Sequence, residues 1–144
     1  MMNGVIRSAV DEALDSILAQ WNEAGSNWDT EGLAALFTND ALFWGSKPDL
    51  FIGHQIQKYY EAFPVKSCRF NFLEMKSVVL SPNTVVSCGV LLLSQVLVTM
   101  QKLEVKLRVS LVLVKLDSGW KIVQHHVAPT KGFTAADLVP KEIG

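Results

Sequence analysis

The chain lacks the residue patterns that mark several large classes of protein. It has two cysteines in 144 residues, and 13 basic against 14 acidic residues leave a net charge of -1. Two cysteines do not make a disulfide framework, and dispersed charges without a basic excess argue against a nucleic-acid partner. Neither a P-loop nor a dinucleotide glycine pattern is present. The three histidines follow no metal-ligand spacing, so we expect no metal and no cofactor.

Long apolar runs are missing as well. The most apolar segments, residues 90–98 and 107–116, are interrupted by polar side chains well before the ~20 residues that span a bilayer. The N-terminus shows no secretion-signal pattern, and the acidic residues in its first amphipathic stretch are unlike a transit peptide. We therefore expect a cytoplasmic protein without a membrane partner.

What the chain does have is a high apolar content. Hydrophobic residues make up 49% of the sequence, and the mean hydropathy is +0.24. A chain of this length forms one domain, which we place over residues 1–144 with its core at about residues 5–129 and a tail at residues 130–144. A small domain with such a high apolar content is expected to bury part of its surface against a second copy of the chain.

The spacing of apolar residues changes from helical in the first half to strand-like in the second. Three- and four-residue steps from Val5 to Trp21 predict a long helix that Gly25 closes. A short helix is expected over residues 30–37 with Asp29 as its cap. A strand at residues 41–45 and a third helix between Gly53 and Pro64 complete this half. Four long strands follow, at residues 66–80, 84–100, 103–116 and 120–128.

This order predicts an α+β domain with helices on one face of an antiparallel sheet. The two cysteines fall on neighbouring strands, where pairing about the turn at residues 81–83 sets Cys68 near Val96 and Cys88 near Lys76. That separation is too large for a disulfide. We expect both cysteines to be reduced and buried.

The last hairpin indicates which residues share a face. A three-residue loop at residues 117–119 sets Ser110 opposite His126 and Val112 opposite Gln124, with Arg108 further along the same face. We expect the helices to close over this polar face and form a pocket. The other face, with His125 at its end, would then pack against a second copy in a twofold homodimer.

Several short motifs follow one another in a characteristic order and spacing between about residues 10 and 129. They comprise Trp21, Trp28-Asp29, Leu33, Leu36-Phe37, Asp40-Ala41 and Phe43, then Gly53, Ile56 and Tyr60, then Arg108 and Ser110, and finally Gly119–Val123 with His126. In these motifs the chain resembles the nuclear transport factor 2-like superfamily, in particular its SnoaL-like branch.

The resemblance implies a cystatin-like α+β cone, with three N-terminal helices packed on a strongly curved, mostly antiparallel sheet around a central pocket. Members include isomerases, dehydratases, cyclases and association domains, so the fold does not choose a function. The sequence also departs from the pattern. Trp44-Gly45 stands where ketosteroid isomerases carry an acidic base, Gln124 replaces a histidine, and Ala128 replaces a serine.

Two functions fit these residues. In the first, the protein is a cofactor-free isomerase, dehydratase or cyclase acting on a small hydrophobic carbonyl or acidic compound. His126 moves a proton, since histidine titrates near neutral pH, and Arg108 steadies an oxyanion. In the second, it is a non-catalytic ligand-binding or oligomerisation module, in which the same groups fix the orientation of the ligand. The alternative to both roles of His126 is a structural histidine hydrogen-bonded to Ser110. The expected ligand-binding residues are Gln124, Ser110, Tyr60, Trp28, Trp44 and Asp40.

Overall fold

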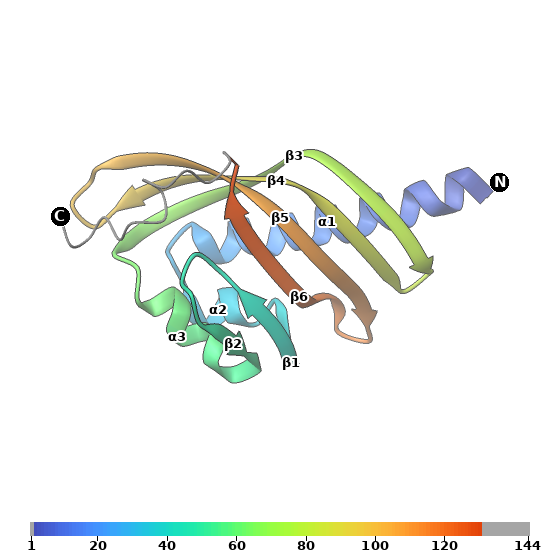
Figure 1. The fold of residues 1–144 in the computed structure, drawn as a ribbon, viewed down its shortest axis with the longest axis horizontal. Coiled ribbons are helices and arrows are strands. Elements are labelled where there is room, and N and C mark those ends of the chain that lie inside the picture. Colours follow the sequence, from blue (N-terminus) through green and yellow to red (C-terminus); the bar gives the residue numbers. More distant parts are fainter. Residues whose placement is uncertain (1, 131–144) are drawn as a thin grey trace.

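The computed structural model describes the backbone of residues 2–130 and the side chains of residues 9–130. It shows an α+β arrangement in which one curved sheet wraps around helix α1 (Figure 1). The tail predicted over residues 130–144 lies outside the described residues except for Thr130. The helical elements are α1 (Met2–Gly25), α2 (Thr30–Ala34), the 3-10 turn η1 (Gly53–Gln55) and α3 (Ile56–Glu61). The strands are β1 (Phe37–Trp44), β2 (Leu50–Ile52), β3 (Val65–Ser81), β4 (Thr84–Leu97), β5 (Lys102–Leu116) and β6 (Gly119–Pro129).

The long helix and the four long strands lie where the apolar spacing predicts them. The short elements differ. Asp29 caps α2 as expected, accepting a hydrogen bond from the Gly32 N–H at 3.1 Å, but α2 ends at Ala34 rather than at residue 37. The chain then enters β1 four residues earlier than predicted, because Phe37 already pairs with Ile122 of β6. The three-residue strand β2 is too short to show a period, and the sequence did not indicate it.

The six strands form one mixed sheet in the order β2-β1-β6-β5-β4-β3. All neighbours are antiparallel except β1 and β6, which run parallel. This parallel pairing sets Phe43 of β1 beside His125 of β6. It therefore decides which residues of the first half of the chain meet the end of the last strand.

A bulge in β3 accompanies the curvature of the sheet. The register with β4 shifts between Leu73 and Lys76, and Glu74 takes a φ of +54°. Bulges of this kind bend a strand and increase its twist. Gly89 of β4 lies against the bulge, where a Cβ atom would approach the Met75 Sδ to 2.4 Å. A larger residue at position 89 would push the two strands apart.

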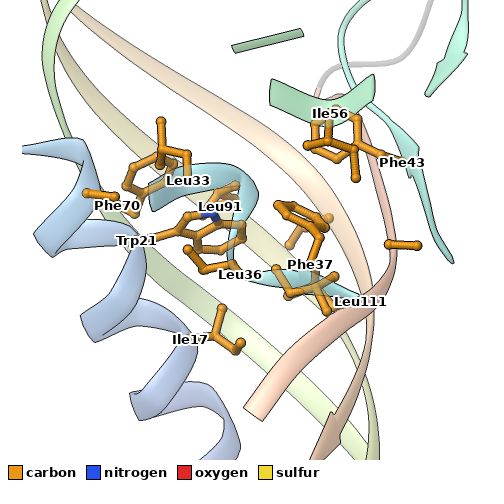
Figure 2. Packing of buried hydrophobic residues seen from close by; sticks show 14 of the residues in the cluster. Ile17, Trp21, Leu33, Leu36, Phe37, Phe43, Ile56, Phe70, Leu91 and Leu111 are labelled. Atoms are coloured by element: carbon orange, nitrogen blue, oxygen red, sulfur yellow. The ribbon is translucent and has the colours of Figure 1, made fainter. Parts of the chain in front are cut away.

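Helix α1 lies across the concave face and packs mainly on β3. Ile17 and Trp21 are fully buried beneath it, and Figure 2 shows Trp21 among Phe70, Leu91, Leu33 and Leu36. The Trp21 ring stacks on Phe70 with centroids 5.0 Å apart. None of the helices within residues 2–130 is both long and apolar enough to cross a bilayer.

The structure reverses the predicted roles of the two sheet faces. The polar residues that were predicted to share a face do so, since Ser110 pairs with His126, Val112 with Gln124 and Arg108 with Ala128. The helices, however, cover the opposite face, where His125, Val109, Leu111, Leu113 and Val127 are buried. Burying the large apolar side chains of this face contributes more stabilising free energy than burying the polar face would. Burying Arg108 without a partner would cost free energy.

The hairpin before β6 also differs in detail from the prediction. Leu116 pairs with Gly119, whose φ is +112°, so the loop has two residues rather than three. A bulge at Val123 then corrects the offset. Because of this bulge, both Ile122 and His125 point to the covered face, and both are buried.

The two cysteines are free, in agreement with the prediction that they form no disulfide. Cys88 pairs with Lys76 as expected, and Cys68 pairs with Gln95, one residue from the predicted partner. Cys68 is buried, and burial raises the pKa of its thiol to about 12. The expectation that Cys88 is buried is wrong, because its side chain lies on the uncovered face.

Candidate functional site

A cavity of about 200 Å³ lies between α1, α3 and the covered face of the sheet. Half of the residues around it carry rings, and none carries an aspartate, glutamate, lysine or arginine side chain. Such a surface favours apolar molecules, with a few polar atoms to orient them. The lining residues are Trp21, Trp28, Phe43, Ser46, Tyr59, Tyr60, Phe63, Cys68, Phe70, Leu91, Leu93, Gln95, Val105, Leu107, His125 and Val127.

Among the titratable side chains of this cavity, His125 matters most for proton transfer and for hydrogen bonding to a ligand. Its ring stacks on Phe43 with centroids 4.3 Å apart and meets the edge of Trp21 at 6.2 Å. The side chain is 4% exposed, and its Nδ1 atom has no hydrogen-bond partner among the described residues. Burial lowers the pKa of His125 to about 3, although the Trp44 backbone acts in the opposite direction. The imidazole is therefore neutral at physiological pH.

Two more ring side chains with polar atoms, Trp21 and Tyr60, line the cavity together with His125. The Nε1 of Trp21 is buried and has no hydrogen-bond partner among the described residues. Burial raises the pKa of the Tyr60 hydroxyl above its ordinary value, and the Trp21 side chain partly opposes that rise. All three groups are uncharged at neutral pH, so the cavity offers hydrogen-bonding capacity but no formal charge.

Aromatic contacts and side-chain hydrogen bonds hold the walls of the cavity in place. The Trp28 Nε1 donates to the Tyr60 carbonyl at 3.1 Å. The Tyr59 hydroxyl accepts from the Ser46 N–H at 2.9 Å and lies 3.0 Å from the Ser46 Oγ. Gly45 allows this arrangement, because a Cβ there would approach the Tyr59 ring and hydroxyl to 2.2–2.6 Å.

Of the eight residues that the sequence placed in the pocket, two line the cavity, and three others, Trp44, Arg108 and His126, line a separate hollow. Tyr60 and Trp28 line the cavity, as predicted. The other six lie elsewhere. His126, Arg108, Ser110, Gln124 and Trp44 are on the uncovered face of the sheet, and Asp40 is exposed and accepts a hydrogen bond from the Thr38 hydroxyl at 2.9 Å. The predicted Ser110–His126 hydrogen bond is not formed, and Cys88 donates to the Ser110 Oγ at 3.6 Å instead.

His125 was not predicted as a site residue, because the polar face of the sheet was expected to face the pocket. A signal was available. Lys106, Arg108 and Gln124 share one face of the last hairpin, while the other face carries leucine and valine at successive positions with a single histidine. Because charged side chains usually face solvent, the charged face should have been placed outside, and His125 would then lie on the covered face.

Among the side chains of residues 9–130, no cluster of three or more histidine, cysteine or acidic groups could hold a metal ion. The cavity lining likewise includes no carboxylate that could pair with His125. The chemistry that the cavity lining offers is therefore apolar contact and neutral hydrogen bonding.

Comparison with known proteins decides the family. A family model of the SnoaL-like domain matches residues 14–130. The chain belongs to the SnoaL-like domain family. The resemblance inferred from the sequence motifs is thus confirmed. Among curated proteins, none matches this SnoaL-like chain significantly.

Solved structures share the fold of the SnoaL-like chain at low identity. A candidate calcium/calmodulin dependent protein kinase II association domain from Xanthomonas campestris has a TM-score of 0.72 at 20% identity, covering 86% of this chain and 87% of that one. A nuclear transport factor 2-like protein from Salmonella enterica gives 0.70 at 17% identity, with 90% and 97% covered. A type 2 hexachlorocyclohexane dehydrochlorinase, LinA, gives 0.68 at 14% identity, with 94% and 96% covered. At these identities the similarity shows the fold alone.

Proposed function

We propose that this SnoaL-like protein binds a small, largely apolar organic molecule in the cavity beneath α1. The observation that carries the proposal is the lining itself, which is rich in aromatic rings and holds no charged side chain. Each square ångström of apolar surface that a ligand removes from water contributes roughly 25 cal/mol. An apolar body can therefore supply most of the binding free energy without an ion pair inside.

The polar atoms of the Trp21 and His125 rings orient the ligand in the cavity. Trp21 can donate one hydrogen bond through its Nε1, and the His125 Nδ1 can donate or accept depending on its tautomer. Both atoms lack a partner among the described residues. A ligand oxygen that reached them would satisfy groups that are now buried without hydrogen bonds, which favours a ligand with a carbonyl, ether or hydroxyl.

Catalysis is a second candidate, in which the protein is a cofactor-free isomerase, dehydratase or cyclase. It is favoured by the histidine in the cavity and by the similarity to a dehydrochlorinase. His125 replaces His126 as the proton carrier in this version. Two features weigh against it, since a pKa of about 3 makes the imidazole a poor base and the cavity lining provides no carboxylate to raise that pKa. We therefore place binding first.

The uncovered face of the sheet supports a further part of the proposal, a homodimer. Its apolar residues include Val86, Val90 and Val112 at the centre and the exposed Leu42 and Trp44 at the β1 edge. The side chain of Trp44 is 46% exposed. A second copy packed on this face would remove these side chains from water. The sequence predicted the same kind of packing, but for the face that carries His125.

The binding proposal can be tested with a variant that fills the cavity. Leu93 lines the cavity, whereas the neighbouring Leu92 points to the uncovered face. Neutral aromatic amides of increasing size, namely benzamide, cinnamamide and 2-naphthamide, are titrated while the tryptophan fluorescence is recorded. We expect at least one amide to bind the wild type and Leu92→Trp, and Leu93→Trp to bind it at least tenfold more weakly. Equal affinity for the two variants would contradict the proposed site.

A further inference from the structure

The cavity runs from a buried inner end to an open outer end. His125 belongs to the inner end, where the lining side chains are almost fully buried. The half-buried lining residues, such as Phe63 and Gln95, mark where solvent reaches the cavity. The Pro64 carbonyl accepts from the Val98 N–H at 2.9 Å, which joins the segment after α3 to the segment after β4. The outer end of the cavity therefore lies where α3 and β4 end.

Gln95 is a polar side chain in an apolar part of the covered face. Its partners on the neighbouring strands are Cys68 of β3 and Leu103 of β5. On its own strand, the nearest residues of the same face are Leu93 and Leu97, which pack against the core. None of these four side chains contains an oxygen or a nitrogen atom, and no described residue forms a hydrogen bond with the Gln95 amide. The amide is therefore free to bind a molecule in the cavity.

The chemistry of an amide side chain limits which ligand groups suit it. It presents an acceptor oxygen next to a donor nitrogen, so a primary carboxamide or a lactam can pair with both atoms at once. A ketone, an ether or an ester pairs with the donor alone and leaves the Gln95 oxygen without a partner, which costs free energy where water is partly excluded. A carboxylate has the same shortcoming and adds a charge that no lining side chain balances.

We propose that Gln95 determines the ligand class of the cavity by selecting a molecule whose outer end carries a neutral carboxamide or lactam. Two hydrogen bonds join the Gln95 amide to this group, and the apolar body of the ligand lies among the aromatic rings further in. The proposal rests on the binding function proposed above and names its ligand class. An oxygen at the inner end of the same ligand would serve Trp21 and His125.

The first experiment compares amides with ketones of nearly the same shape, in which a methyl group replaces the amide nitrogen. The pairs are benzamide with acetophenone and 2-naphthamide with 2-acetylnaphthalene, titrated by calorimetry into the wild type, Gln95→Leu and the control Gln101→Leu. Gln101 is exposed in the turn between β4 and β5 and does not line the cavity. In Gln95→Leu, the ratio of amide affinity to ketone affinity should fall at least about tenfold, because the ligand amide loses both partners. Leucine suits the apolar neighbours of position 95, so this variant should fold.

A second experiment tests the same contact by changing charge. Benzamidine has the shape of benzamide and carries a positive charge at pH 7. The wild type should bind it more weakly than benzamide, since no lining side chain balances that charge. Gln95→Glu places a carboxylate at the proposed contact, where its two oxygens can accept from both amidine nitrogens, and should reverse the order of the two ligands. Gln101→Glu should keep the order of the wild type.

An affinity ratio that is the same in the wild type and in Gln95→Leu would overturn the proposal and leave the binding function intact. The proposal is also wrong if Gln95→Glu keeps the wild-type order, or if the Gln101 variants behave like the Gln95 variants, because the ligand amide would then lie away from Gln95. If neither pair of amide and ketone binds the wild type, the binding function fails together with this inference.

Discussion

His125 is the residue on which the account depends most. Its imidazole is enclosed by Phe43, Trp21 and Phe37, and its Nδ1 has no partner among the described residues. A polar atom buried without a hydrogen bond costs about 1–3 kcal/mol. A protein that keeps such an atom in a cavity gives up stability at that position, which is typical of residues that serve a ligand.

Replacing His125 with phenylalanine should therefore stabilise the empty protein. The ring keeps its stack on Phe43 and the unpaired Nδ1 is removed, whereas the interaction of the imidazole with the Trp44 backbone is lost, so the free energy of unfolding should rise by about 1 kcal/mol. Urea denaturation at pH 7 measures the change, and His126→Phe on the uncovered face is the matched control. A loss of stability in His125→Phe would mean that the imidazole makes structural hydrogen bonds.

The same residue predicts a pH dependence. The pKa of His125 is about 3 in the folded protein, below the ordinary value of about 6.5. Between these values the unfolded chain binds a proton that the folded chain does not, so stability falls as the pH falls. At pH 5 this single group should lower the free energy of unfolding by about 2 kcal/mol relative to pH 8. The wild type should lose this stability and His125→Phe should not, whereas parallel pH profiles for the two proteins would refute the shift.

Among the secondary-structure elements, helix α1 is hydrogen-bonded to the edge strand β3 through the side chain of Asn22. The Asn22 Oδ1 accepts from the Phe70 N–H at 2.7 Å, and the Asn22 Nδ2 donates to the Phe70 carbonyl at 3.1 Å. Both backbone groups belong to a strand with no further neighbour in the sheet. One turn later, Gly25 comes so close to the Cys68 carbonyl that a Cβ would lie 2.4 Å from its oxygen.

Asn22→Ala removes both hydrogen bonds and leaves the Phe70 groups without their partner. The free energy of unfolding should fall by about 1–2 kcal/mol, even though alanine is the better helix former. Glu23→Ala, at an exposed position beside it, should change stability by less than about 0.5 kcal/mol. Chemical denaturation compares the two variants. Similar small effects would show that the packing of Trp21 and Ile17 alone holds the helix.

How far the sequence predicts the elements depends on their length. The strands β3 to β6 contain enough residues to show a period of two, and Thr84 and Leu116 mark boundaries that the structure reproduces. The strand β2 and the early start of β1 exist because of pairing with distant residues, such as Phe37 with Ile122. Local spacing does not contain this information.

At the scale of the whole molecule, the sequence predicts which residues share a face but not which face the helices cover. Strand pairing puts Ser110, Gln124 and His126 together whichever way the sheet is turned. The direction is decided by where Trp21 and Ile17 of α1 find apolar partners, which is a property of the assembled fold. For this reason, the family and the α+β fold with a curved sheet were predicted correctly, while most of the predicted site residues lie outside the cavity.

The uncovered face carries the prediction about assembly. If a second copy packs on it, the protein in solution should have twice the 15.9 kDa mass of the chain. Val112→Glu places a charge at the centre of that face, opposite Val86, and should shift the protein to monomers because a buried unpaired charge is costly. Light scattering coupled to size exclusion reads the mass. A wild-type monomer at tens of micromolar would contradict the dimer.

Ligand binding in the cavity beneath α1 is tested most directly by asking whether a bound molecule reaches the Trp21 indole. A proton–nitrogen correlation spectrum shows the indole N–H signals of the four tryptophans, and Trp21→Phe assigns the signal of Trp21. On addition of an amide that binds, the Trp21 and Trp28 signals should move most, because both rings line the cavity, while Trp44 and Trp120, which do not line it, move least. If the Trp21 signal stays in place at saturation while the Trp44 signal moves, the ligand binds outside the cavity, and the account of the site is wrong.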